Sequence, residues 1–273
     1  MRNQQRGFIT ASAIVATFGV VALIYFSFAM SVYAKKVGEQ DDNQREWLAE
    51  TQHKLDAWYE RNKAAIDANT DPIPVNVILS QSGVVLEHGA KIESTPRLIA
   101  AGIGFHNIVI WIPHDGASGT GLNPLTGEFN PGLLADGVTL APTKFALTNG
   151  RAIETRAYLS TVTKMRANAS RFEGYYQAKL SLDPDADATI DYFRAADCAS
   201  PKNGELPCID THTDIGPGNV QTLLGLSSDD IVNAWGGAVQ ISNLEDLPTG
   251  GHTISLKTAT PWGQDIQIIA VRP

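Results

Sequence analysis

The chain has 273 residues, a formal net charge of −8 and two cysteines. An acidic chain of this kind is poorly suited to neutralise phosphates, so we expect no nucleic-acid partner. Two cysteines exclude a disulfide-rich scaffold and a four-cysteine zinc site. The charge is uneven along the chain, because residues 1–36 carry four basic residues and no acidic one. A basic, apolar head therefore precedes an acidic body.

The N-terminal segment contains 27 consecutive uncharged residues, 8–34. A helix of this length is about 40 Å long, which exceeds a hydrocarbon core of about 30 Å. A cleaved secretory signal usually has a shorter apolar core. The segment therefore predicts a membrane-spanning helix. Arg2 and Arg6 before it balance Lys35 and Lys36 after it, so the flanking charges indicate its orientation only weakly.

The next segment, residues 39–69, contains neither proline nor glycine, and its apolar residues recur at steps of three and four. This spacing predicts an amphipathic helix with one apolar stripe. The stripe consists of Trp47, Leu48, Thr51, Leu55, Trp58, Tyr59 and Ile66. The prolines of residues 71–74 end this helix. Only Gly38 separates it from the apolar segment, and one continuous helix over 8–69 would be about 93 Å long.

The rest of the chain, residues 70–273, is predicted to form one globular domain. Short runs rich in β-forming residues occur at 75–79, 84–86 and 108–112, and residues 113–137 predict a long surface loop rich in glycine and proline. Residues 151–182 predict a helix. The end of the chain predicts three strands near 237–243, 252–258 and 265–271, with a turn at 247–251. A long helix packed on an antiparallel sheet, an α+β fold, follows from this order.

Two similar turns occur in the C-terminal part, 27 residues apart. Trp235-Gly236 and Trp262-Gly263 each begin the pattern Trp-Gly-x-x-(Val/Ile)-Gln-Ile. Each copy predicts a turn that leads into an alternating strand. A duplicated hairpin corner of any β domain explains the repeat as well.

The start of the apolar segment carries the residues of a family resemblance. Arg6-Gly7-Phe8-Ile9 resembles the cleavage site of type IV pilins and type II secretion pseudopilins, where a prepilin peptidase cuts after the glycine and methylates the new N-terminal phenylalanine. The long helix resembles the pilin spine, and the Trp-Gly turns resemble the turn that enters the C-terminal sheet of that family. The resemblance covers the first 69 and about the last 55 residues.

The resemblance implies a specific organisation. It consists of a basic leader at 1–7, a transmembrane and filament-core helix at 8–34, an amphipathic spine helix at 35–69 and a globular pilin-like domain at 70–273. Processing falls between Gly7 and Phe8. The implied fold is α+β, with a long N-terminal membrane-spanning spine helix packed on a C-terminal antiparallel β-sheet domain.

Ser12 departs from the pattern of the family. Major pilins usually carry glutamate at this fifth mature position, where it is thought to pair with the N-terminal amine of a neighbouring subunit. A buried amine without a partner is costly, whereas a subunit at the tip has no preceding amine to neutralise. Ser12 and the size of the chain therefore favour a minor subunit at the tip or at initiation.

The implied function is that of a minor subunit of a type IV pilus or related pseudopilus, used for adhesion, conjugation or secretion. The implied partners are other pilin subunits, a prepilin peptidase, an inner-membrane assembly platform, the membrane, and a receptor or secreted substrate at the loop 113–137. The implied location is the inner membrane with a periplasmic domain, then a cell-surface pilus or a periplasm-spanning pseudopilus. The alternative is a membrane-anchored extracytoplasmic binding protein that does not polymerise.

Two further sites concern the globular domain. Cys198 and Cys208 enclose nine residues, and in an oxidising extracytoplasmic location they predict a disulfide; two buried free thiols are the alternative. Asp183, Asp185 and Asp187 alternate like the oxygen ligands of a calcium loop, although they fail the EF-hand pattern. The alternative there is an acidic helix start. We expect no cofactor apart from this candidate calcium ion.

Motifs for enzymatic chemistry are missing from the sequence. Neither Gly-x-Ser-x-Gly nor His-Glu-x-x-His occurs, and the glycines at 116, 119 and 121 lack the lysine of a phosphate loop. His114-Asp115 comes nearest to a catalytic pair, but an ordinary turn explains it better. We therefore expect no enzyme. A hydrolase would require a serine or cysteine within hydrogen-bond reach of His114 and Asp115.

Overall fold

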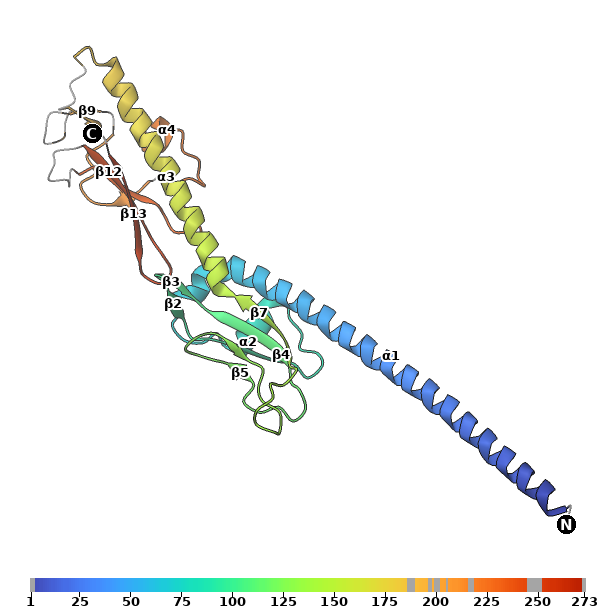
Figure 1. Cartoon of the computed structure of the whole chain (residues 1–273). Helices are drawn as coiled ribbons and strands as arrows, with labels where there is room; N and C mark the ends of the chain where they lie inside the picture. Colours follow the sequence, from blue (N-terminus) through green and yellow to red (C-terminus); the bar gives the residue numbers. More distant parts are fainter. Residues whose placement is uncertain are drawn as a thin grey trace. The chain divides into compact units, whose positions relative to one another are not determined.

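The computed structural model describes residues 3–185, 190–195, 198, 202–204, 206–215, 219–244 and 252–271, with backbone alone for 3–25, 202–204, 219 and 271. Two compact units are present, Met1–Gln52 and His53–Pro273. The helices are α1 (Asn3–Ala68), α2 (Val75–Ser82), α3 (Gly150–Leu182) and α4 (Asn219–Leu223) (Figure 1). The strands are β1 (Lys91–Ser94), β2 (Leu98–Ala100), β3 (Ile103–Phe105), β4 (Asn107–Ile112), β5 (Gly121–Leu122), β6 (Phe129–Asn130), β7 (Lys144–Asn149), β8 (Asp191–Ala195), β9 (Lys202–Gly204), β10 (Thr213–Asp214), β11 (Gln240–Ser242), β12 (Thr253–Ala259) and β13 (Asp265–Val271).

Helix α1 is the long N-terminal helix that the sequence predicts, and it ends shortly before the prolines of residues 71–74. Within the part of the chain that the structure describes, however, no helix is both long enough and apolar enough to cross a membrane. Charged residues recur at short intervals in α1 from Lys35 onward. This finding contradicts the expected membrane-spanning helix at 8–34 and the expected inner-membrane location.

The strands form several small sheets instead of the expected single sheet packed against the N-terminal helix. One sheet has the order β1-β4-β7 and another the order β10-β11-β12-β13, while β2–β3, β5–β6 and β8–β9 form separate pairs. The pair β8–β9 is parallel. The structure is α+β, and the pilin-like single sheet under the spine helix is a wrong expectation.

The first sheet is centred on β4, whose six residues are all buried. Such a continuous apolar run is typical of a strand that is covered on both faces. In the same unit, the α1 residues Leu55, Trp58, Tyr59 and Ile66 are buried, as the predicted stripe requires.

Residues 75–79 form part of α2, so the predicted strand there is wrong. Pro74 precedes the helix with an extended conformation, and Gly83 ends it with a positive φ of 72°. Proline before the first turn and glycine after the last are typical helix boundaries. Only Ile78 is buried within the helix, because eight residues present just one face to the core.

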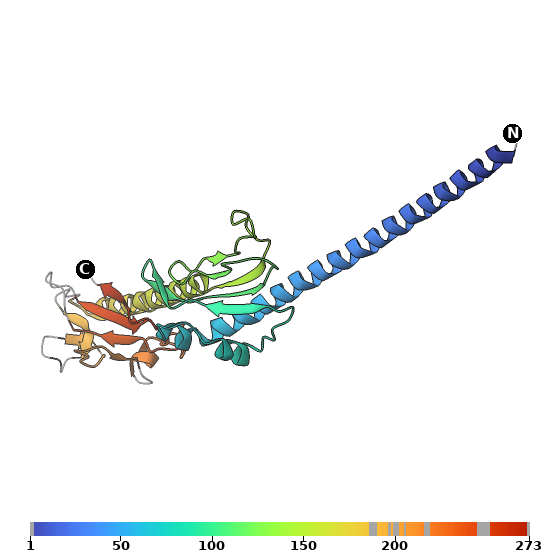
Figure 2. The same ribbon diagram turned by 90° about the horizontal axis from the view of Figure 1, so that it is seen from below.

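Helix α3 is the predicted helix at 151–182, and it follows β7 without an intervening loop. The side chain of Asn149, the last residue of β7, accepts a hydrogen bond from the backbone N–H of Ala152 at 3.1 Å and so caps the helix. Figure 2 shows α3 beside β12 and β13. The strands β11, β12 and β13 lie where the sequence predicts strands, whereas the predicted turn at 247–251 lies outside the described residues.

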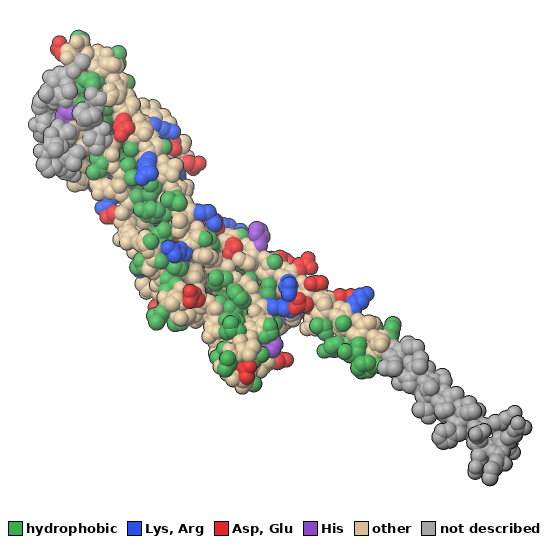
Figure 3. All heavy atoms as spheres, in the orientation of Figure 1, with side chains coloured by type: hydrophobic (Ala, Val, Ile, Leu, Met, Phe, Trp, Pro, Cys, Tyr) green, Lys and Arg blue, Asp and Glu red, His purple; other side chains and the backbone are tan. Residues whose placement is uncertain are grey.

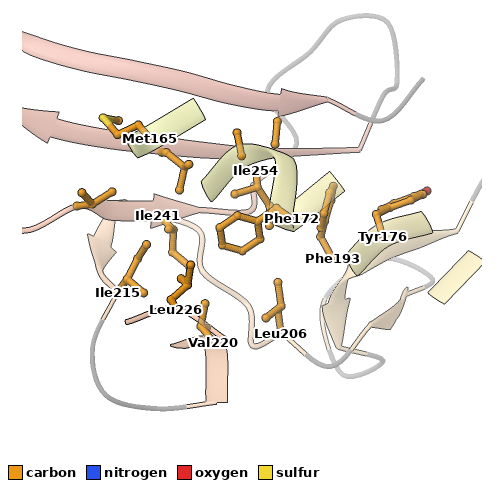
Figure 4. Close-up of a cluster of buried hydrophobic side chains, with 14 of the residues drawn as sticks. Met165, Phe172, Tyr176, Phe193, Leu206, Ile215, Val220, Leu226, Ile241 and Ile254 are labelled. Carbon is orange, nitrogen blue, oxygen red and sulfur yellow. The ribbon is translucent and has the colours of Figure 1, made fainter. Parts of the chain in front are cut away.

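An apolar core lies between α3 and the sheet β10-β11-β12-β13. Figure 4 shows side chains from the helix meeting those of the strands and of the segment 206–226. Its fully buried members include Met165, Phe172, Tyr176, Phe193, Leu206, Val239, Ile254 and Leu256. These side chains form one contiguous core that joins α3 to the C-terminal strands.

Candidate functional site

Helix α1 carries a row of exposed apolar side chains in the first unit (Figure 3). Phe26, Met30, Tyr33 and Val37 are 63%, 53%, 67% and 48% exposed. Their spacing of four, three and four residues places them on one face of the helix, as in helices that pack along one another. We call these four residues the α1 apolar face. Large exposed apolar faces typically mark interaction sites.

The predicted processing and assembly residues Gly7, Phe8 and Ser12 lie on the backbone of α1. Their side chains lie outside the described part of the chain. Cleavage after Gly7 and the role of Ser12 in subunit register therefore stay predictions.

The two Trp-Gly turns come together in the second unit. Trp235 and Trp262 pack edge to face, with ring centroids 5.3 Å apart and an interplanar angle of 86°. Gly236 and Gly263 have φ values of 81° and 84°, which favour glycine. The sequence repeat therefore corresponds to two turns that meet.

Each of these tryptophans binds a different part of the fold. The indole N–H of Trp262 donates to the carbonyl of Gly102 at 3.0 Å, in the turn between β2 and β3. The indole N–H of Trp235 donates to Glu154 Oε2 at 2.6 Å. A Cβ at Gly104 would lie 2.8 Å from Trp262, so only glycine allows this close approach. The pair joins the C-terminal turns to both α3 and the β2–β3 hairpin.

Beside Trp235 lies a cluster of buried polar groups that no local sequence pattern indicates. Asp67, Glu154 and Tyr59 are each 0% exposed. The Tyr59 hydroxyl donates to Asp67 Oδ1 at 2.7 Å and accepts from the backbone N–H of His106 at 2.9 Å. Burial, together with the neighbouring Glu154, raises the pKa of Asp67 to about 9. Burial also raises the pKa of Glu154.

His106 lies at the edge of this cluster. Its Nδ1 lies 2.8 Å from the carbonyl of Thr95, and its Nε2 lies 3.3 Å from the carbonyl of Asn69. Burial lowers the pKa of this imidazole, so the ring is neutral at pH 7. Gly150 is the first residue of α3. A Cβ at this position would lie 1.9 Å from the carbonyl oxygen of His106, so a residue with a side chain does not fit here.

A groove of about 490 Å³ lies between the end of α1 and α2. Trp58, Ile66, Ile73 and Val77 provide apolar walls, and the amides of Asn62, Asn69 and Gln81 lie at its rim. The Trp58 indole donates to Gln81 Oε1 at 3.3 Å. Apolar walls with a few polar groups are typical of ligand sites.

The predicted surface loop at 113–137 contains the short hairpin β5–β6 and is ordered by its own turns. Asn123 Oδ1 accepts from the backbone N–H groups of Leu125 and Thr126. Asp136 accepts from Thr139 and Val138, and these hydrogen bonds, led by the Thr139 hydroxyl, lower its pKa. Leu125 is 85% and Val138 82% exposed. The loop thus presents apolar tips, and its contact with a receptor or substrate stays a prediction.

Cys198 and Cys208 form a disulfide, as predicted. The calcium hypothesis gains no support, because Asp183 is engaged elsewhere: it accepts from the backbone N–H of Asp185 and from the Tyr192 hydroxyl. Asp187 lies outside the described residues. Over the residues that the structure describes, no cluster of three or more His, Cys, Asp or Glu side chains is arranged to hold a metal ion.

His114 and Asp115 lie at an exposed turn, where the N–H of Ala117 donates to the carbonyl of His114. A serine–histidine contact occurs elsewhere, because His212 Nε2 lies 3.0 Å from Ser255 Oγ. Ser255 also accepts from Gln267 Nε2 at 2.7 Å and lies in the middle of β12, between two paired strands. Backbone N–H groups committed to a ladder cannot form an oxyanion hole. The contact is therefore explained as part of the polar face of the sheet.

Comparisons with models of protein families, with curated proteins and with solved structures give no match. The pilin resemblance thus rests on the residues that carry it and stays a prediction.

Proposed function

We propose that the chain is a minor subunit of a filament of the type IV pilin class, assembled through α1. The observation that carries the proposal is the α1 apolar face, Phe26, Met30, Tyr33 and Val37, whose members are 48% to 67% exposed. Burying a large apolar side chain contributes about 1.5–3 kcal/mol. Packing of α1 side by side with an apolar helix of another subunit would bury this face.

The N-terminal residues favour the pilin class among helical assemblies. Gly7-Phe8 at the start of a long uncharged stretch supports processing by a prepilin peptidase. Ser12 supports a tip or initiating position, because such a subunit does not need the glutamate that registers repeating subunits. The exposed apolar side chains of Leu125 in the loop and of Val138 directly after it would then contact the receptor or secreted substrate.

The assembly step is tested by one substitution on the α1 apolar face and one on another face. Met30→Glu places a charge on this face. Ser31→Glu, the matched control, adds the same charge one residue later, about 100° around the helix. In cells that assemble the filament, we expect the wild-type chain and Ser31→Glu to be recovered with sheared filaments, and Met30→Glu to be absent from them. Absence of the wild-type chain from the filaments, or equal recovery of both variants, would contradict assembly through this face.

The processing step is tested by mass spectrometry of the N-terminal peptide from cells with and without a prepilin peptidase. We expect peptidase-dependent cleavage after Gly7, with methylated Phe8, and loss of cleavage in Gly7→Val. An intact Met1 in cells that contain the peptidase would remove the chain from the pilin class. Assembly without cleavage would indicate a helical oligomer of another kind.

A second candidate function is that of a binding protein that does not polymerise, favoured by the groove of about 490 Å³ between α1 and α2. It predicts an uncleaved, monomeric chain. It also predicts that Val77→Trp, which fills the groove, abolishes capture of the ligand without changing the oligomeric state. The first candidate predicts that this substitution leaves assembly unchanged.

A further inference from the structure

Three segments that are distant in the sequence meet at Asp67 and Glu154 in the second unit. Asp67 belongs to the last turn of α1, Glu154 to the second turn of α3, and Trp235 to the first Trp-Gly turn. Tyr59 donates to Asp67 Oδ1 at 2.7 Å, and Trp235 donates to Glu154 Oε2 at 2.6 Å. Each carboxyl group therefore has one oxygen satisfied by a neutral donor.

The other oxygen of each carboxyl group has no donor among the described residues. Asp67 Oδ2 and Glu154 Oε1 are both buried, and no described N–H or O–H group donates to either oxygen. The two carboxyl groups lie close enough to interact with each other. Two ionised carboxylates in contact inside a protein repel each other strongly. A carboxyl group that holds a proton can instead donate it to its neighbour, so that one proton satisfies both remaining oxygens.

The charged groups around the pair do not neutralise it. On α1, Lys63 Nζ is bound to Glu60 Oε1 at 3.3 Å and to the Glu60 carbonyl at 3.0 Å. Arg97, before β2, donates to the backbone carbonyl of Asp67 at 3.0 Å, and His106, before β4, is neutral. Lys63 and Arg97 favour ionisation, but burial is the largest influence on both carboxyl groups.

We propose that Asp67 and Glu154 share one proton and form a proton-dependent latch, which holds the end of α1 to α3 and to the Trp235 turn. Loss of the proton leaves two negative charges in a site that excludes water. The electrostatic cost is relieved when α1 and α3 separate and the carboxylates become hydrated. The latch is closed at neutral pH and opens at alkaline pH.

The sign of the pH dependence follows from the raised pKa of Asp67. Its value moves from 3.8 to about 9, so between these pH values the folded chain binds more protons than the unfolded chain. The contribution to stability is therefore complete below pH 3.8 and is lost progressively as the pH rises through about 9.

Amide substitutions in the full chain test the latch, because they imitate the protonated group. Asp67→Asn retains an acceptor for Tyr59 and donates an N–H to Glu154. Glu154→Gln retains an acceptor for Trp235 and donates an N–H to Asp67. Glu173→Gln removes the same charge at an exposed position of α3 and serves as the control. We expect the urea midpoint of unfolding of the wild-type chain to decrease when the pH is raised from 5 to 9. Over the same pH range the equilibrium constant of unfolding changes in both proteins. We expect the change in Asp67→Asn to be smaller than that in the wild type by a factor of about ten or more, since one pKa unit corresponds to a factor of ten.

The local opening is measured by hydrogen exchange at pH 9. We expect amides near Asp67 and Glu154 to exchange faster in the wild-type chain than in Asp67→Asn, with Glu173→Gln matching the wild type. Carboxyl-carbon NMR of wild-type chain labelled at Asp and Glu does not depend on any variant folding, and it should show one carboxyl group titrating far above pH 7. Titration of every carboxyl group below pH 6, or an unchanged pH profile in Asp67→Asn, would overturn the latch.

Discussion

Trp235 and Trp262 occupy the same position in two similar turns, and their rings pack edge to face with centroids 5.3 Å apart. Edge-to-face packing of this kind contributes about 0.5–1.5 kcal/mol beyond the buried area. One indole is bound to Glu154 on α3 and the other to Gly102 in the β2–β3 hairpin. The aromatic pair therefore connects the hairpin, α3 and the C-terminal strands in a single contact.

Replacing Trp262 should destabilise the chain strongly. Trp262 is only 7% exposed, and Trp262→Ala would remove both its packing and its hydrogen bond, at a cost of about 3–5 kcal/mol. Trp262→Phe keeps an aromatic ring but loses the indole donor, so we expect a smaller loss. Urea unfolding of the full chain measures both. Equal free energies for wild type and Trp262→Ala would show that the pair is not part of the stabilising core.

Glycine at position 101 should stabilise the chain. Ala101 and Gly102 form the two-residue turn between β2 and β3, and both have positive φ, 52° and 77°. Alanine is strained in this region by about 1–2 kcal/mol, whereas glycine is not. We expect Ala101→Gly to raise the free energy of unfolding by about 1 kcal/mol. Ala101→Val should lower it, because a β-branched residue tolerates positive φ worse than alanine does.

Reduction of the disulfide should loosen the second unit. Cys198 and Cys208 close a short loop, with a sequence separation of 10, and such a crosslink contributes about 2–3 kcal/mol in the chain-entropy description. We expect the double variant Cys198→Ser, Cys208→Ser to lose this amount in urea unfolding. A reductant should lower the midpoint of the wild-type chain and leave that of the double variant unchanged.

Acid should weaken the segment that joins α4 to β11. Asp230 accepts from the backbone N–H and the hydroxyl of Ser227, both at 2.8 Å, and from Arg171 at 3.0 Å. These hydrogen bonds lower the pKa of Asp230. Asp230 therefore contributes its full stabilisation when the pH is above 3.8, the ordinary pKa of an aspartate. This stabilisation is lost as the pH falls through the lowered pKa of Asp230 in the folded chain.

We expect Asp230→Asn to be less stable than wild type at pH 7 by about 1 kcal/mol. This difference should shrink toward pH 2, where wild-type Asp230 becomes protonated. Thermal unfolding at both pH values measures it. A difference that stays constant with pH would indicate a packing effect instead of a charge effect.

Local periodicity was enough to predict the long elements. Helices α1 and α3 follow from apolar residues at helical spacing, and β12 and β13 follow from alternation between turn residues. The predicted strand at 75–79 is wrong because a short apolar run suits a strand and a helix equally, and the flanking Pro74 and Gly83 decide in favour of the helix.

The buried carboxyl pair could not be predicted from local sequence. Asp67 and Glu154 are 87 positions apart, and each looks like part of a polar helix face until the fold brings both inside. The Trp-Gly repeat was visible, because it is local, but the contact between its two copies was not. Partners that meet only through tertiary packing leave no signal in a single sequence.

Helix α3 also has a mechanical consequence. Asn149 ends β7 and caps α3, so strand and helix join without a flexible residue between them. The 33 residues of α3 form a rigid rod about 50 Å long. A rotation of about 5° at Asn149 would therefore displace Leu182 by about 4 Å. A small rotation of α3 where it joins β7 therefore produces a larger displacement at its C-terminal end.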